Sequence, residues 1–184
     1  MSRIAVFFAQ GFEEIEALTV VDVCRRGGIC VDMVSVEEKG EAAGSHGICV
    51  RMDKTFAEAK ETEYDCLVLP GGLPGTTNLE AHEGLMKLVE AYYEQGKYIA
   101  AICAAPSIFG HKGFLKGRKA CSYPSFESHL EGAKVTNGPV EIDGNVITSR
   151  GMGTAIDFGL AILGVLCGTE AAEKLAQGIV YHKC

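Results

Sequence analysis

Cys103 is the residue whose surroundings point most directly to chemistry. It follows a short apolar run, Tyr98–Ile102, and precedes Pro106, a residue type that suits the first turn of a helix. This order predicts a strand, a sharp turn and a helix, the geometry that exposes a nucleophile above a sheet. The following helix N-terminus also favours a thiolate. We therefore predict that Cys103 is a reactive nucleophile in a strained backbone conformation, whereas a buried, inert role fits most of the other seven cysteines.

Two other stretches carry the groups that a nucleophilic thiol requires. Glutamates at positions 13, 14 and 16 follow the Gln10-Gly11 turn, although acids also suit a helix N-terminus, which explains at least one of them. The glycine-rich turn 70–75 lets backbone N–H groups approach a ligand and lacks the Gly-Lys-Ser/Thr ending of a phosphate loop. At the carboxyl ends of parallel strands these turns would meet Cys103. The N–H groups of Gly72 and Ala104 are then expected to hold an oxyanion.

Strands alternate with helices along the chain, and continuous apolar runs mark strands that are buried on both faces. We predict strands over 3–9, 29–35, 64–69, 98–102, 118–121, 134–136 and 146–149, with a turn at Asp143-Gly144 between the last two. We predict helices over 13–26, 55–60, 83–95, 153–167 and 170–177, a loop or hairpin over 37–47 with a short strand at 48–52, and a short helix or loop over 125–131. This alternation predicts one α/β domain, 1–184, around a mostly parallel sheet.

The composition excludes several classes of protein. A net charge of −7 without a basic stripe argues against a nucleic-acid partner. No apolar run is long enough to span a membrane, and the N-terminus lacks the features of a signal peptide. The eight cysteines include no C-x-x-C pair and no zinc-type spacing. We therefore expect a cytoplasmic protein in a reducing compartment, with neither a metal nor another cofactor.

Four segments together resemble the ThiJ/PfpI superfamily, and in particular its DJ-one branch. They are Ala9–Glu16, Leu67–Gly72, Ala100–Pro106 and Thr148–Gly151, and the similarity runs nearly from end to end in the same order. The resemblance implies a flavodoxin-like, class I glutamine amidotransferase-like three-layer sandwich with a mostly parallel central sheet. It also implies a homodimer, in which the first helix packs at the two-fold interface.

The resemblance further implies roles for individual residues. Cys103 would be the reactive cysteine, Glu16 its protonated carboxyl partner, and Gly72 and Ala104 the oxyanion donors. We expect the pKa of Glu16 to rise and that of the thiol to fall. The implied activity is a glyoxalase or deglycase that needs no cofactor and acts on a small carbonyl substrate such as methylglyoxal. The alternatives are an oxidative-stress sensor or redox-regulated chaperone that uses the same cysteine, and, less favoured, an amidase, a peptidase or a ThiJ-type role in thiazole monophosphate metabolism.

Three positions differ from what the superfamily often carries. Ala104 stands where the protease-like branch has histidine, so a Cys–His peptidase would need another base. Tyr123, before Pro124, stands where relatives often have histidine, and a tyrosine donates a hydrogen bond but is a poor base at neutral pH. His46 stands where relatives often have arginine, in a loop expected to approach the site of a second protomer. We treat Tyr123 and His46 as candidate accessory residues.

Overall fold

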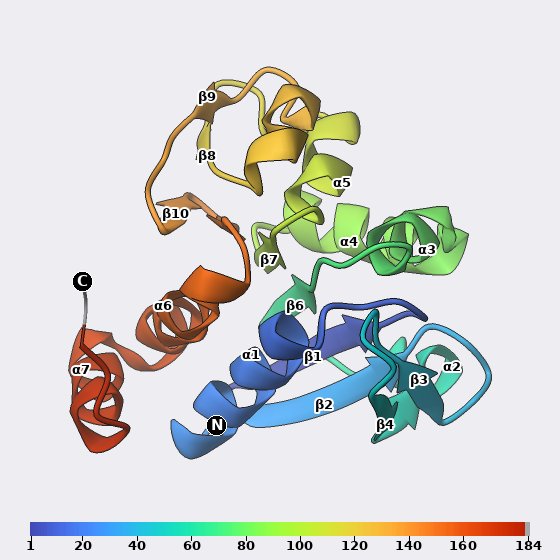
Figure 1. Ribbon diagram of the computed structural model, residues 1–184, viewed down its shortest axis with the longest axis horizontal. Helices are drawn as coiled ribbons and strands as arrows, with labels where there is room; N and C mark the ends of the chain where they lie inside the picture. The colour runs from blue at the N-terminus through green and yellow to red at the C-terminus, as the bar shows by residue number, and fades with distance from the viewer. Residues whose placement is uncertain (183–184) are drawn as a thin grey trace.

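A mostly parallel sheet forms the middle layer of the molecule (Figure 1). The computed structural model describes residues 1–182, and within them this sheet has seven strands. Their order is β10 (Val140–Asp143), β11 (Val146–Ser149), β7 (Tyr98–Ile102), β6 (Cys66–Leu69), β1 (Arg3–Phe8), β2 (Cys30–Ser35) and β5 (Lys54–Thr55). Neighbouring strands are parallel except β10 and β11, which form an antiparallel hairpin.

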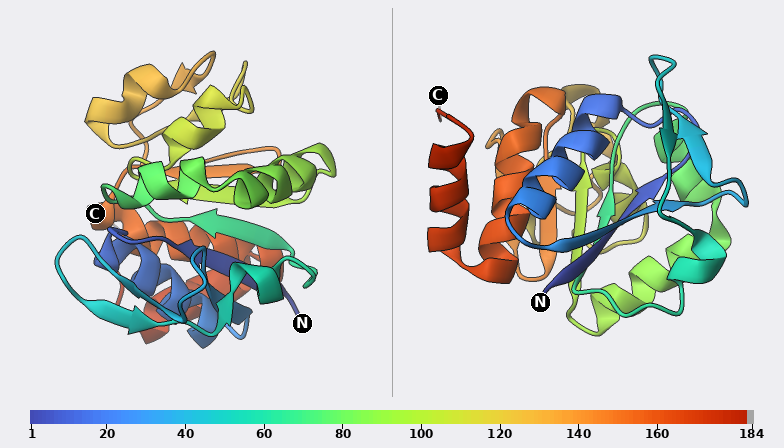
Figure 2. Two further views of the ribbon diagram at one scale, coloured as in Figure 1. Left: turned by 90° about the vertical axis from the view of Figure 1, so that its right-hand side faces the viewer. Right: turned by 90° about the horizontal axis from the view of Figure 1, so that it is seen from below.

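Helices cover both faces of this sheet (Figure 2). On one face lie α1 (Glu14–Arg26), α6 (Ala155–Cys167) and α7 (Thr169–Gly178), and on the other lie α2 (Phe56–Ala59), α3 (Gly75–Ala81), α4 (Glu83–Glu94) and α5 (Pro106–His111). Side chains of β1 alternate between the two cores, since successive residues of a strand point to opposite faces. The predicted α/β three-layer sandwich is therefore confirmed. No helix among residues 1–182 is both long and apolar enough to cross a membrane.

Smaller elements lie outside the central sheet. The predicted hairpin is present, because β3 (Glu41–Ala43) pairs with β4 (Cys49–Arg51) in antiparallel fashion. The short strand β8 (Lys119–Ala120) pairs in parallel with β9 (Lys134–Val135), and the 3-10 turn η1 (Pro124–His129) lies between them in the chain. A second 3-10 turn, η2 (Met152–Thr154), follows β11.

One sequence-based expectation is wrong, and some elements were not predicted. The turn at Asp143-Gly144 joins β10 to β11 rather than the segment 134–136 to 146–149, because 134–136 pairs with β8 in a separate small sheet. Strand β10 was not predicted, since its Val-Glu-Ile-Asp sequence lies at a half-exposed edge and carries two acids. Helix α3 was also not predicted, because its start, Gly75-Thr-Thr-Asn, contains weak helix formers.

Candidate active site

Cys103 occupies the turn between β7 and α5. Its φ of 65° lies in the left-handed region, so the predicted strain is confirmed; such a conformation costs a non-glycine residue about 1–3 kcal/mol. Two backbone hydrogen bonds hold the turn: the Cys103 N–H donates to the Ser149 carbonyl at 3.0 Å, and its carbonyl accepts the Tyr123 N–H at 2.9 Å. Pro106 begins α5 directly after the turn. The half-buried thiol is therefore fixed above the carboxyl ends of β7 and β11.

Glu16 faces this thiol from the first turn of α1. The carboxyl group is buried, hydrogen-bonds the Cys103 thiol, and accepts the N–H of Gly71 at its Oε2 at 3.0 Å. A Cβ on Gly71 would lie 2.6 Å from both the Cys103 Cβ and the Glu16 Oε2. Glycine is therefore required where the glycine-rich turn passes between the acid and the thiol. Of the three clustered glutamates, the one implied by the resemblance is in contact with Cys103.

The two ionisable groups influence each other strongly. Burial raises the pKa of Glu16 to about 7, although hydrogen bonds from Cys103 and Gly71 act in the opposite direction. Burial, and then the Glu16 carboxylate, also raises the pKa of the Cys103 thiol, and hydrogen bonds from the N–H groups of Ala104 and Gly72 only partly offset this. The expected fall in the thiol pKa is therefore wrong. Because two adjacent negative charges in a buried site repel, the pair does not lose both protons together; above about pH 7 it retains one proton and carries a single negative charge.

The predicted backbone donors surround the sulfur atom. The N–H groups of Gly72 and Ala104 both hydrogen-bond the Cys103 sulfur. Gly72 has a φ of 90°, a left-handed conformation that favours glycine. The site lies beside β1 and β6. The strand order reverses there, because β2 is added on one side of β1 and β6 on the other, and ligands usually bind at such a point in this architecture. Acid, thiol and two N–H donors thus converge from three separate strand ends.

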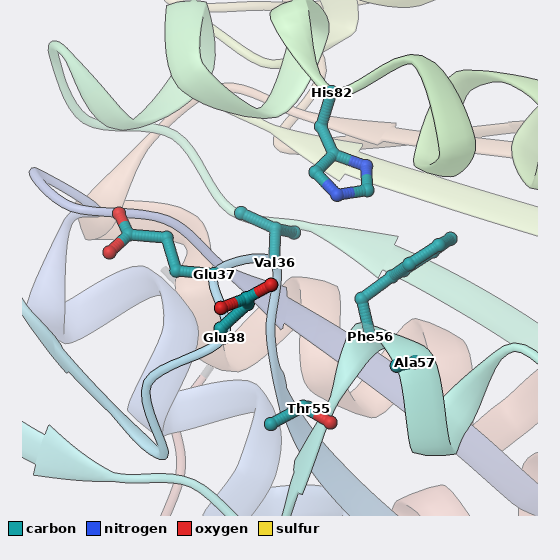
Figure 3. Close-up of a pocket in the computed structure, with 7 residues that line it drawn as sticks. All are labelled: Val36, Glu37, Glu38, Thr55, Phe56, Ala57 and His82. Carbon is teal, nitrogen blue, oxygen red and sulfur yellow. The ribbon is translucent and has the colours of Figure 1, made fainter.

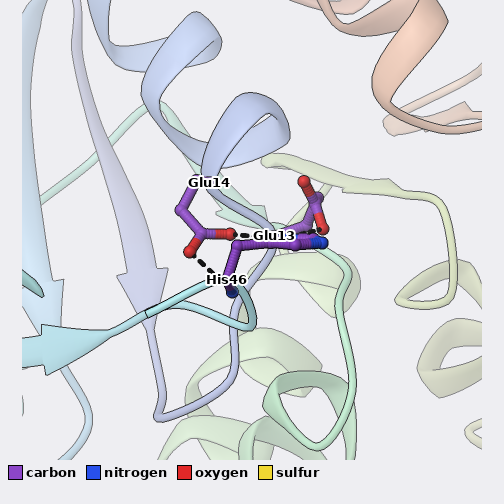
Figure 4. Close-up of side chains that lie close together, drawn as sticks. All are labelled: Glu13, Glu14 and His46. Atoms are coloured by element: carbon purple, nitrogen blue, oxygen red, sulfur yellow. Dashed lines mark hydrogen bonds and ion pairs between the residues drawn. The ribbon is translucent and has the colours of Figure 1, made fainter. Parts of the chain in front are cut away.

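The two candidate accessory residues lie in different places. Tyr123 is half exposed, and its ring borders the site: a Cβ on Gly151 would lie 3.4 Å from the ring and 3.9 Å from the Glu16 Oε1. His46 instead lies over Glu14, with its Nδ1 3.1 Å from the Glu14 Oε2 (Figure 4). Its approach to a second protomer stays a prediction. Donor atoms of His46, Glu13 and Glu14 lie within 4.8 Å of one another and could hold a metal ion.

A family model for the DJ-1/PfpI family matches residues 2–164. The chain belongs to the DJ-1/PfpI family. Among the similar proteins of this family, Drosophila melanogaster protein dj-1beta is 36% identical over 98% of both chains, and the Danio rerio Parkinson disease protein 7 homolog is 33% identical over 97% of this chain and 96% of its own. The predicted family is therefore confirmed.

Another DJ-1 relative is much longer than this chain, and solved DJ-1 structures share its fold. Arabidopsis thaliana DJ-1 homolog B is 37% identical over 97% of this chain, but the chain spans only 41% of that relative. The structure of oxidized Toxoplasma gondii DJ-1 superimposes with a TM-score of 0.95 at 35% identity over 100% of both chains. Drosophila DJ-1beta gives 0.94 at 34% identity with the same coverage.

Sequence reasoning missed several supporting parts of this DJ-1/PfpI site. Ser149 and Gly71 lie within the similar segments, but Ser149 contributes through its backbone carbonyl, which its residue type does not reveal, and Gly71 was not distinguishable from the other glycines of its turn. Arg150 had a signal, because it belongs to the Thr148–Gly151 segment. Its guanidinium donates to the Ser122 carbonyl at 3.5 Å and to Glu127 at 3.4 Å, and so braces the segment that carries Tyr123.

A separate cavity of about 390 Å³ lies at the β5 edge of the sheet, away from the thiol (Figure 3). The residues that line it are Val36, Glu37, Glu38, Thr55, Phe56, Ala57 and His82. The His82 Nδ1 already accepts the Leu85 N–H at 3.0 Å as a helix cap. Because the lining offers neither a thiol nor a strained residue, we place the candidate active site at Cys103.

Proposed function

We propose that the chain is a cofactor-free, cysteine-dependent glyoxalase that acts on methylglyoxal-like 2-oxoaldehydes, with deglycase-type action on their adducts. The observation that carries the proposal is the contact between a strained thiol and a buried carboxyl group whose pKa is raised to about 7 by burial. A group with that pKa both gives and takes a proton at neutral pH. Membership of the DJ-1/PfpI family supports the proposal at the level of the family only.

The first step is addition of the Cys103 sulfur to the aldehyde carbon. The reactive form of the pair has its proton on Glu16 and its negative charge on the sulfur. As the S–C bond forms, the π electrons of the aldehyde move to its oxygen. The N–H groups of Gly72 and Ala104 lie beside the sulfur and stabilise this oxyanion, and Glu16 then protonates it to a hemithioacetal.

The second step moves one proton between adjacent carbons. Glu16, now a carboxylate, removes the proton from the carbon bonded to sulfur, and the electron pair forms an enediol. Return of the proton to the neighbouring carbon gives the thioester of a 2-hydroxy acid. One carbon is oxidised and its neighbour is reduced, so no external oxidant or reductant is needed. Water then adds to the thioester, the C–S bond breaks, and the pair regains its proton; methylglyoxal would yield lactate.

Tyr123 is proposed as a positioning residue for the substrate. Its ring borders the site next to Gly151, and its half-exposed phenol can donate a hydrogen bond to the second carbonyl oxygen. Its N–H already fixes the Cys103 carbonyl, so the ring and the nucleophile are mechanically linked. We assign His46 no step in this reaction, because its imidazole lies over Glu13 and Glu14.

The proposal is tested by lactate formation from methylglyoxal without glutathione. Cys103→Ala should lower kcat/KM by at least about 10³-fold, since the nucleophile is lost. Cys49→Ala is the matched control, because this exposed cysteine lies on β4 outside the site and should leave turnover unchanged. Equal activity of wild type and Cys103→Ala, or no lactate from either, would reject the glyoxalase.

A redox sensor or chaperone is the second candidate for the same site. A half-buried thiol in contact with a carboxyl group and two N–H donors would also stabilise a sulfinic acid after oxidation. Toxoplasma gondii DJ-1, with which the chain shares its fold, has been solved in an oxidized form. Mass spectrometry after mild peroxide treatment separates the candidates, because a sensor should form the sulfinic acid at Cys103 and show no turnover.

A further inference from the structure

The loop between β3 and β4 folds onto the N-terminal end of α1. Glu14 is buried beneath this loop, and its Oε1 accepts the N–H groups of His46 at 2.8 Å and Ile48 at 3.4 Å. A Cβ on Gly44 would lie 2.3 Å from the Glu14 carboxyl group, so glycine is required for this close approach. Backbone groups thus satisfy one carboxylate oxygen and leave Oε2 facing the side chains of the loop.

Four donor atoms converge at that point, and Figure 4 shows three of the side chains that carry them, those of Glu13, Glu14 and His46. The His46 Nδ1 lies 3.1 Å from the Glu14 Oε2 and 3.5 Å from the Glu13 Oε2. The Ser45 Oγ lies 3.1 Å from the Glu13 Oε2, 3.3 Å from the Glu14 Oε2 and 3.1 Å from the His46 Nδ1. Two carboxylates, one imidazole and one hydroxyl from two elements distant in sequence therefore share one small volume.

The separations match the edges of a coordination shell. Ligand atoms roughly 2.1 Å from a central ion lie about 3.0 Å apart in an octahedron and about 3.4 Å apart in a tetrahedron. Five of the six distances among the four atoms fall between 3.1 and 3.5 Å, and the donor oxygens of Glu13 and Glu14 lie within 4.8 Å of each other. At most two hydrogen atoms, one on the Ser45 hydroxyl and one on the His46 ring, are available to form hydrogen bonds in these contacts. A cation would contact all four donors at once and would neutralise the facing carboxylates.

We propose that Glu13, Glu14 and His46 bind one first-row divalent metal ion, with Ser45 and water completing its coordination. A mixed set of imidazole nitrogen and carboxylate oxygen suits such an ion better than Ca²⁺, which prefers oxygen alone. In the single chain the His46 side chain is 70% exposed, so water can reach its imidazole and complete the coordination. The ion would tie the β3–β4 loop to α1, the helix that carries Glu16.

Mn²⁺ is the appropriate probe, because it has little affinity for the thiol of Cys103 and broadens nearby NMR signals. During titration of the full chain, amide signals of residues 12–16 and 44–48 should broaden first. His46→Ala removes a ligand and should raise the Mn²⁺ concentration needed for half-maximal broadening by about 100-fold or more. Loss of a group that only hydrogen-bonds a metal ligand already lowers metal affinity by about 10- to 100-fold. Glu13→Gln, a second variant that keeps the size of its side chain, should weaken binding in the same direction.

His111→Ala is the matched control. His111 also pairs with a carboxylate, with its Nδ1 2.7 Å from the Glu80 Oε1, and its Nε2 lies 3.1 Å from the His129 Nδ1. This variant should bind Mn²⁺ as the wild type does. Broadening centred on residues 111 and 129, unchanged binding by both His46→Ala and Glu13→Gln, or no broadening at millimolar Mn²⁺ would each overturn the proposal.

Discussion

At the scale of single residues, the site combines two unfavourable features. Cys103 adopts a left-handed conformation, and Glu16 is a carboxyl group held out of water beside a thiol. Neither feature helps the chain to fold, so both are retained at a cost in stability. The cost of Glu16 depends on pH, since burial holds its pKa at about 7 in the folded state against an ordinary value of 4.5.

We predict that Glu16→Gln stabilises the protein at pH 8 while it lowers turnover by about 10²-fold or more. Because the folded-state pKa is raised, the penalty is absent below about pH 4.5, grows as the pH rises, and is complete above pH 7. A pKa shift of this size corresponds to a loss of at most about 3 kcal/mol from the free energy of unfolding. Thermal melts at pH 8 and pH 4 test the difference, with the exposed Glu90→Gln on α4 as the control. An equal change at both pH values would contradict this account.

At the scale of elements, apolar runs identified the buried strands, because burial on both faces leaves a signal in the sequence itself. The missed elements lack that signal. Strand β10 is a half-exposed edge, and α3 begins with weak helix formers, so their structure comes from neighbours rather than from local preference. The contact between β5 and β2 was likewise invisible, although a polar network holds it. Lys54 on β5 contacts Asp32 on β2 at 2.9 Å, and the Tyr64 hydroxyl donates to Asp32 at 2.9 Å.

We predict that Asp32→Asn destabilises the protein by about 1–3 kcal/mol at pH 7. Burial alone would raise the pKa of Asp32, but its hydrogen bonds with Lys54 and Tyr64 outweigh burial and lower it. The stabilisation is therefore present above the ordinary pKa of 3.8 and is lost as the pH falls through the lower folded-state value. Urea unfolding at several pH values measures this loss. Asp22→Asn, which breaks a surface pair with Arg26, should change stability by less than about 1 kcal/mol.

At the scale of the whole molecule, one rule, that parallel strands end at a common edge, predicted that Cys103, the glycine-rich turn and the cluster of glutamates would meet. The resemblance to the family then identified Glu16 among the three glutamates. The rule predicts where the turns after parallel strands lie, but it does not predict contacts made by loops outside the central sheet. The approach of His46 to Glu14 depends on a hairpin that lies outside the central sheet, so neither spacing nor periodicity could reveal it. The direction of the thiol pKa was missed for a related reason, since the degree of burial belongs to the assembled fold.

We predict a homodimer that uses the outward side of α1, as homodimers are common in the DJ-1/PfpI family. Ile15 and Ile156 remain 49% and 39% exposed beside a groove of about 570 Å³, which is lined by Leu18, Thr19, Asp22, Val23, Arg26, Ile156, Gly178 and Ile179. Light scattering at micromolar concentration should give twice the chain mass. Ile15→Glu should yield monomers, whereas Ile142→Glu on the β10 edge should not. A monomeric wild type would refute the dimer.

The lateral edges of the central sheet have a further consequence for the behaviour of the chain in a crowded solution. Strand β5 has two residues and begins with Lys54, and β10 has four residues, of which Glu141 and Asp143 are acids. Short, charged edges are poor templates for strand addition by another chain. The sides of the molecule therefore resist the edge-to-edge aggregation to which sheet proteins are prone, whatever happens at the end of the sheet that carries the candidate active site.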